Sequence, residues 1–287
     1  MCDNDINPGV MEDWSLTRRS FMKTGALAAG FAASAAAAAE TVVEKDVTIK
    51  TPDGTCDAAL IYPSGAGTWP AVIMWPDILG LRPVFRDMGK RLAAQGYVVL
   101  VPNPFYRSKK APVMEGSVDF SNREAMQTLF GYRNAITDDG IDKDTVALIG
   151  FLDAQPQVAK GKKAGVQGYC MSGPFTFRAA AAMPDRIGAA ASFHGGGLVT
   201  KEASSPHLLI PKAKAAFLVA IAQNDDQREP DAKTVLKDAF AAAGKTATVE
   251  VYPADHGWTV PGSQAYNEPA AEKAWAELTK LYKAKLV

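Results

Sequence analysis

The chain has 287 residues, of which 47% are hydrophobic and 22% are charged, a composition that is typical of a globular protein and excludes a disordered chain, a collagen or a coiled coil. Thirty-one basic and thirty-one acidic residues give a formal net charge of zero. Proteins that bind nucleic acids carry a basic surplus that displaces counterions, so no nucleic-acid partner is expected.

The first 39 residues have the features of a bacterial export signal. Arg18 and Arg19 precede an apolar run over residues 25–39, which ends in three alanines that suit a signal peptidase. The pattern resembles the twin-arginine signal, which predicts that the export machinery moves the folded protein to the periplasm and that residues 40–287 remain as one domain. The run is too short and too rich in alanine for a permanent membrane span. A disordered N-terminal tail is the alternative.

From residue 42 onward, apolar and amphipathic segments alternate. Residues 42–51 and 55–62 flank Pro52-Asp53-Gly54 and predict an antiparallel hairpin. Strands are then expected at 71–75, 97–101, 164–168, 187–193, 215–222 and 248–252, and helices at about 83–95, 122–136, 141–159, 172–182, 231–243 and 268–284. This alternation predicts the α/β class: a mostly parallel sheet with helices on both faces and the antiparallel hairpin at one edge.

A nucleophile candidate lies where a predicted strand meets a predicted helix, in the sequence G-Y-C-M-S-G at 168–173. A sharp strand-to-helix turn projects its central residue above the sheet and requires small residues two positions to either side. Gly168 and Ser172 meet that requirement around Cys170, whereas Ser172 itself would have Cys170 where a smaller residue fits better. The N–H of Met171 would then face a developing oxyanion at the helix N-terminus. The alternative is a buried structural cysteine, the role expected for Cys56 within its apolar strand.

A cysteine nucleophile needs a base and an acid that orients the base. The chain has three histidines. His256 follows the last predicted strand, His194 follows an earlier strand and is a second candidate to face the site, and His207 lies in a loop expected to be exposed. The strand before the last one ends at two acids, Asp225 and Asp226, either of which could reach His256. The order nucleophile, acid, histidine is that of the α/β-hydrolase triad. The scattered histidines have no metal-ligand spacing, so neither a metal nor a cofactor is expected.

Together these segments resemble the dienelactone hydrolase family, the carboxymethylenebutenolidases, over essentially the whole chain after residue 40. The family's G-x-C-x-G-G elbow is matched around Cys170, with Ser172 where glycine is usual. Its D-x-x-x-P segment is matched by D-Q-R-E-P, which favours Asp226 over Asp225, and its histidine segment by H-G-W at His256. The resemblance implies an α/β-hydrolase fold and the opening of a small ester or lactone through a Cys-His-Asp triad and an acyl-enzyme.

The resemblance also implies roles outside the triad. The family's E-I-x-G pattern is matched by D-I-L-G at 77–80, which implies that Asp77 holds the resting thiol and that the N–H of Ile78 completes the oxyanion hole with that of Met171. A P-x-x-Y-x-R-like stretch, within a long expected loop, ends at Arg107, implied to bind the carboxylate of the lactone. The family's second carboxylate-binding arginine is replaced by Val260.

Two other functions remain open because a fold alone does not establish chemistry. The first is a non-catalytic binding or sensor protein that keeps the thiol in its pocket without turnover. The second is an esterase or thioesterase that shares the triad but takes a larger substrate than a small ester or lactone.

Overall fold

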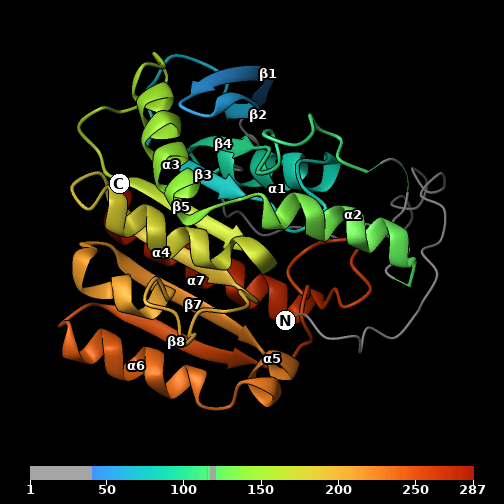
Figure 1. Ribbon diagram of the computed structural model, residues 1–287. Coiled ribbons are helices and arrows are strands. Elements are labelled where there is room, and N and C mark those ends of the chain that lie inside the picture. Colours follow the sequence, from blue (N-terminus) through green and yellow to red (C-terminus); the bar gives the residue numbers. More distant parts are fainter. Residues whose placement is uncertain (1–40, 115, 117–120) are drawn as a thin grey trace, which may run out of the picture.

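A computed structural model describes residues 41–114, 116 and 121–287. These residues build one eight-stranded sheet in the order β1-β2-β4-β3-β5-β6-β7-β8 (Figure 1). The strands are β1 (Val42–Thr51), β2 (Gly54–Pro63), β3 (Ala71–Trp75), β4 (Val98–Pro102), β5 (Ala164–Tyr169), β6 (Ile187–Phe193), β7 (Ala216–Ala222) and β8 (Ala247–Tyr252). The hairpin β1–β2 joins β4 in antiparallel orientation, and the strands from β4 across to β8 are parallel. The predicted fold class is confirmed.

Helices cover both faces of the sheet, which explains the continuous apolar strands. In β3, Ile73 and Trp75 enter the core on one side, and Val72 and Met74 enter the core on the other. The first core is closed by α2 (Arg123–Asn134), α3 (Asp138–Asp153), α4 (Gly173–Ala182) and α6 (Ala232–Ala242), and the second by α1 (Pro83–Ala93) and α7 (Glu268–Leu286). In Figure 1, α3 and α4 lie in front of the sheet and α7 lies behind it.

The predicted elements are present, and the main differences are at ends that depend on side-chain contacts. Helix α3 begins near residue 138 rather than 141, because the Thr137 hydroxyl caps it by accepting the N–H of Gly140 at 3.0 Å. Short elements without a counterpart in the prediction are the 3₁₀ segments at Cys170–Ser172 and Pro206–Lys212 and helix α5 (Gln223–Arg228). Helix α5 has a direct consequence for the candidate triad, since it carries both candidate acids.

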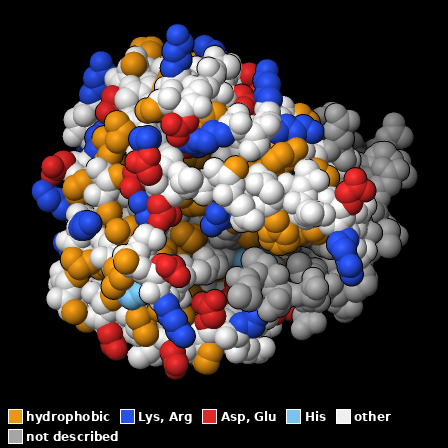
Figure 2. Space-filling view, in the orientation of Figure 1, with side chains coloured by type: hydrophobic (Ala, Val, Ile, Leu, Met, Phe, Trp, Pro, Cys, Tyr) orange, Lys and Arg blue, Asp and Glu red, His pale blue; other side chains and the backbone are white. Residues whose placement is uncertain are grey.

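The proposed export signal lies outside the described residues, so its removal and the domain boundary at residue 40 stay predictions. Within the described part of the chain, no helix is long and apolar enough to cross a membrane. Figure 2 shows Lys and Arg side chains interspersed with Asp and Glu over the visible face, which agrees with the zero formal charge of the chain.

Candidate active site

The turn between β5 and α4 has the geometry of a nucleophile elbow. Cys170 has a φ of +56°, a left-handed conformation that is uncommon for residues other than glycine, and its side chain is only partly buried. A Cβ on Gly168 would lie 2.1 Å from the carbonyl oxygen of Ser172, so the turn admits only glycine at position 168. The predicted small-residue requirement therefore has a direct steric cause.

Ser172 stabilises the elbow from inside. Its fully buried hydroxyl accepts the N–H of Tyr169 at 2.9 Å and lies 2.9 and 2.8 Å from the carbonyl oxygens of Trp75 and Pro76. These contacts tie the elbow to the end of the neighbouring strand β3. Ser172 is thus a structural residue here, whereas Cys170 stands at the apex of the turn.

His256 lies in the loop after β8 and is held by contacts with two residues of helix α5. Its Nδ1 lies 2.7 Å from Oδ2 of Asp225, and its backbone N–H donates to Oδ1 of Asn224 at 2.9 Å. Burial works to lower the pKa of His256, but the neighbouring Cys170 and the Asp225 carboxylate together hold that pKa well above its ordinary value. The imidazole therefore has a carboxylate on one side and Cys170 as an electrostatic neighbour.

The choice of Asp226 as the orienting acid is wrong in this arrangement. Both oxygens of Asp226 bind Nζ of Lys233, at 2.8 and 2.7 Å, while Asp225 is the acid that contacts His256. The reason is helix α5, because successive residues of a helix point about 100° apart and only one of two adjacent acids can face the histidine. The motif spacing selects the correct segment but the wrong member of the pair.

The oxyanion-hole candidates Ile78 and Met171 follow the ends of two neighbouring strands, β3 and β5. In the parallel pair β3–β5, Trp75 is opposite Gly168, and Ile78 and Met171 each follow three positions later. Their backbone N–H groups therefore belong to adjacent turns at the carboxyl edge of the sheet, where ligands of parallel sheets collect.

Asp77, expected to hold the thiol, is engaged elsewhere. Its two carboxylate oxygens accept from Nη1 and Nη2 of Arg82, at 2.5 and 2.9 Å, and Oδ1 also accepts the N–H of Leu79 at 3.0 Å. Both carboxylate oxygens of Asp77 thus bind Arg82. The structure corrects the expectation that Asp77 holds the thiol. Aspartate is one methylene shorter than the family's glutamate, and the arginine five positions later is within its reach.

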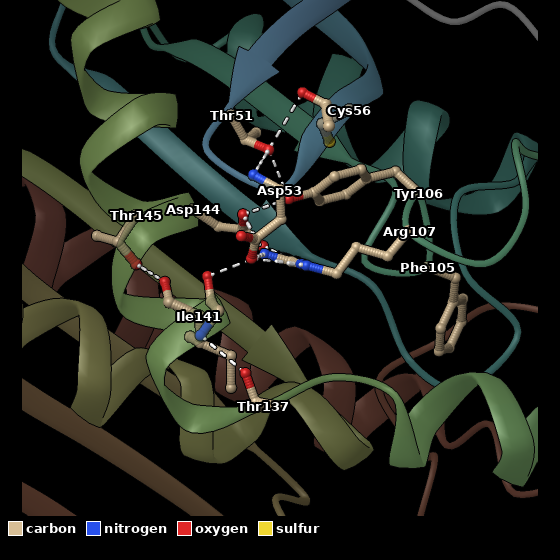
Figure 3. Close-up of polar contacts among 12 residues, drawn as sticks. Thr51, Asp53, Cys56, Phe105, Tyr106, Arg107, Thr137, Ile141, Asp144 and Thr145 are labelled. Carbon is tan, nitrogen blue, oxygen red and sulfur yellow. Dashed lines mark hydrogen bonds and ion pairs between the residues drawn. The ribbon is translucent and has the colours of Figure 1, made fainter.

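Arg107 is also placed differently from expectation. Its guanidinium binds Asp53 in the β1–β2 turn at 2.8 Å and both oxygens of Asp144 on α3, each at 2.8 Å (Figure 3). Asp144 accepts a further hydrogen bond from the hydroxyl of Tyr106 at 2.6 Å. Each guanidinium nitrogen thus has a protein acceptor, and Arg107 ties the hairpin to α3 instead of offering a free cation to a substrate. Val260, the other arginine position of the family, is a buried apolar residue.

Of the remaining histidines, His194 lies in the site and His207 does not contribute to the contacts around Cys170. The ring of His194 is buried, lies 4.9 Å from the ring of His256 and accepts the backbone N–H of Cys170 through Nδ1 at 3.1 Å. His207 is half-buried, not exposed as expected, and its Nδ1 lies 2.7 Å from the hydroxyl of Ser205. Cys56 is buried in β2, as expected. The described residues contain no His, Cys, Asp and Glu cluster suited to a metal ion.

Comparison with known proteins gives the family. The model of the dienelactone hydrolase family matches residues 56–286. The chain belongs to this family. Relatives from Synechocystis and Methylorubrum extorquens, each named "Putative carboxymethylenebutenolidase", are 28% identical over 231 residues and 27% identical over 283 residues. The matches cover 79% and 92% of this chain and 91% of each relative.

A solved structure shares the fold of this chain. A structure from Klebsiella pneumoniae, titled "Putative Dienelactone Hydrolase", superimposes with a TM-score of 0.74 at 23% identity, covering 85% of this chain and 99% of that one. The family match and these relatives identify the chain as a hydrolase of the dienelactone hydrolase type. The elbow around Cys170 and the contact between His256 and Asp225 form the candidate active site of this family member.

Proposed function

We propose that this dienelactone hydrolase family member opens small carboxylic esters or lactones through Cys170, His256 and Asp225. Cys170 Sγ attacks the carbonyl carbon while its proton passes to Nε2 of His256. Asp225, bound at Nδ1, fixes the tautomer and stabilises the imidazolium. The N–H groups of Ile78 and Met171 stabilise the tetrahedral oxyanion.

The second half of the proposed cycle uses the same groups in reverse. His256 returns its proton to the leaving alkoxide as the carbon–oxygen bond breaks, which leaves a thioester on Cys170. His256 then takes a proton from water, and the hydroxide attacks the thioester carbon. The carbon–sulfur bond breaks, the carboxylic acid leaves, and the proton on His256 passes to the sulfur to restore the thiol. In a lactone, the alkoxide and the acid are parts of one product.

The observation that carries the proposal is the pair of His256 and Asp225 beside an elbow cysteine. The 2.7 Å contact leaves Nε2 as the free side of the imidazole, and the pKa of His256, which burial alone would lower, is raised by Cys170 and Asp225. A histidine that is merely structural has no need of both a carboxylate and a thiol as neighbours.

The charges around the site favour a neutral substrate over an anionic lactone. The relatives' name refers to an enzyme of a carboxylated lactone, and the family resemblance assigns carboxylate binding to two arginines. Here Arg107 is neutralised by Asp53 and Asp144, and Val260 replaces the second arginine. A neutral ester needs no cationic partner, so simple esters or uncharged lactones suit this chain better.

Hydrolysis of an aryl acetate and of a dienelactone, with Cys170→Ala and Cys56→Ala as a matched pair, tests the proposal. Cys170→Ala should abolish turnover with the circular-dichroism spectrum unchanged, while Cys56→Ala should keep the rate. The acetate should be the better substrate. Turnover that survives in Cys170→Ala would exclude the cysteine mechanism. No turnover of any ester by the wild-type protein would support a binding or sensor protein, and preference for long acyl or thioester substrates would support the larger-substrate esterase.

Export completes the proposed function. The paired Arg18 and Arg19 before the apolar run favour passage of the folded precursor through the twin-arginine machinery to the periplasm, with removal of residues 1–39. Periplasmic and cytoplasmic fractions of cells that express the full chain test this. We expect a shortened periplasmic protein, and its loss when both arginines are replaced by lysine. Export that persists in the double variant would contradict the assignment.

A further inference from the structure

His194 links the nucleophile to the loop that carries the base. Its Nδ1 accepts the backbone N–H of Cys170 at 3.1 Å, and its Nε2 lies 2.8 Å from Oγ1 of Thr259, three residues after His256. The ring is 1% exposed and packs edge-on against the ring of His256, with a centroid distance of 4.9 Å. One imidazole thus contacts the elbow, the base and the base's loop.

The two contacts determine the protonation state of His194. A backbone N–H can only donate, so Nδ1 must be unprotonated, and the single ring proton lies on Nε2, which donates to the Thr259 hydroxyl. Burial, with the neighbouring His256, lowers the pKa of His194 well below its ordinary value. The ring is therefore neutral and cannot replace His256 as the triad base, since its lone pair is committed to Cys170.

The bond to Cys170 acts on the strained residue of the turn. Cys170 holds a φ of +56°, and its backbone N–H donates to Nδ1 of His194, the residue that follows β6. Such a conformation persists only where the surroundings over-determine it. His194 is itself held by its own N–H, which donates to the carbonyl of Ala220 on β7 at 2.8 Å.

We propose that His194 is a positioning residue that holds the Cys170 backbone in the conformation from which its thiol meets His256. This rests on the proposed function in one respect, that Cys170 is the nucleophile. The ring fixes the peptide before Cys170, and through Thr259 it fixes the loop of His256 relative to that peptide. A displacement of about 1 Å between reacting groups costs about 100-fold in rate, which is the size of effect that loss of this bond should have.

Two substitutions separate the acceptor from the volume of the ring. His194→Phe keeps an aromatic ring but has no acceptor for the Cys170 N–H. His194→Asn keeps an acceptor, because its Oδ1 falls near the position of Nδ1, and asparagine tolerates the φ of +40° found at this position. Thr259→Val removes only the partner of Nε2.

The first readout is alkylation of Cys170 by iodoacetamide in the full chain, followed by peptide mass spectrometry over a range of pH. In His194→Phe we expect slower alkylation and a displaced pH midpoint, with rescue in His194→Asn and a smaller change in Thr259→Val. A residue that only fills space would lower the melting temperature without moving the pH midpoint of the folded protein. Equal profiles for wild type and His194→Phe, or equal loss in the Phe and Asn variants, would overturn the proposal.

The second readout is turnover of an aryl acetate. His194→Phe should lower kcat about 100-fold with little change in KM, because the geometry of attack changes and the binding surface does not. If the wild-type protein hydrolyses no ester, the proposed function fails, yet the alkylation series still decides the role of His194. Nitrogen NMR of the wild-type protein gives a check that needs no variant: His194 should show the Nε2–H tautomer, and an Nδ1–H tautomer would contradict the bond to Cys170.

Discussion

Two clusters of charged side chains lie at the carboxyl ends of the strands, and they differ in what they leave unpaired. Around Arg107, the carboxylates of Asp53 and Asp144 occupy every guanidinium nitrogen, and Tyr106 adds a further bond to Asp144. Around His256, Asp225 occupies only Nδ1 and leaves the other nitrogen for Cys170.

The contrast separates a structural ion cluster from a candidate reactive one. In the first, the pKa of Arg107 is raised despite burial because Asp144 and Asp53 bind it, so the guanidinium keeps its charge. In the second, the raised pKa of His256 depends on the neighbouring Cys170 and on Asp225. The proposed function moves a proton between Cys170 and His256, whereas the Arg107 cluster ties the β1–β2 hairpin to α3.

Among variants that keep Cys170, the largest effect is expected from the acid of the proposed triad. Asp225→Asn should lower kcat about 10³- to 10⁴-fold, because an amide cannot stabilise the imidazolium and favours the wrong tautomer of His256. The matched control is Asp226→Asn, one residue away on the same helix, which should stay within about twofold of wild type. Kinetics with an aryl acetate give both numbers, and a larger loss in the Asp226 variant would reverse the assignment.

The same pair of acids shows where prediction from sequence ends. The strand and helix periods, the Pro52-Asp53-Gly54 turn and the small residues around Cys170 are local features, and the fold and the elbow follow from them. The choice between Asp225 and Asp226 depends on a six-residue helix that the sequence pattern does not reveal.

Long-range pairing is the other limit. The motif that suggests a role for Arg107 spans six residues, but the partners Asp53 and Asp144 are 54 and 37 positions away, and only the folded chain brings them together. The sequence makes His194 a candidate to face the site. Its bond to the backbone of Cys170 joins residues 24 positions apart, so it too forms only in the folded chain.

The two cysteines extend the comparison to reactivity. Cys56 is 1% exposed, and burial, with Asp144 and Asp57 nearby, raises the pKa of its thiol far above its ordinary value. Alkylation of Cys56 requires an opening of the fold, and with about 5 kcal/mol of stability it should be at least about 10³-fold slower than alkylation of Cys170. Peptide mapping after timed exposure to iodoacetamide measures both rates, and comparable rates would contradict the burial of Cys56.

A smaller effect is expected where Arg107 is removed. Arg107→Ala leaves the carboxylate of Asp144, which is 4% exposed, without its cation, and should cost about 3 kcal/mol of stability. Thermal melting should detect this as a fall of about 10 °C. The control is Arg186→Ala, whose partner Asp153 is 37% exposed and whose loss should cost about 1 kcal/mol or less.

The same Arg107→Ala variant tests the specificity argument. Below its melting temperature, its ratio of rates on a dienelactone and on an aryl acetate should equal that of the wild-type protein, since each guanidinium nitrogen is already bound to Asp53 or Asp144. A selective loss on the anionic lactone would show that Arg107 exchanges its protein partners for the substrate carboxylate.

The smallest expected effect is the pH dependence that His256 gives to stability. Its pKa in the folded state lies well above the value of about 6.5 that a histidine has in an unfolded chain. The folded protein therefore binds the proton more tightly, so this stabilisation is fully present below about pH 6.5 and is lost as the pH rises through the folded pKa.

In Asp225→Asn one of the groups that raise the pKa of His256 is gone, so the free energy of unfolding should fall less steeply above pH 6.5. Urea titrations of wild type, Asp225→Asn and the Asp226→Asn control at a series of pH values measure the three slopes. Because the other titrating groups are common to all three proteins, a difference confined to Asp225→Asn isolates the His256–Asp225 contact, and equal slopes would mean that this carboxylate does not hold the proton on the histidine.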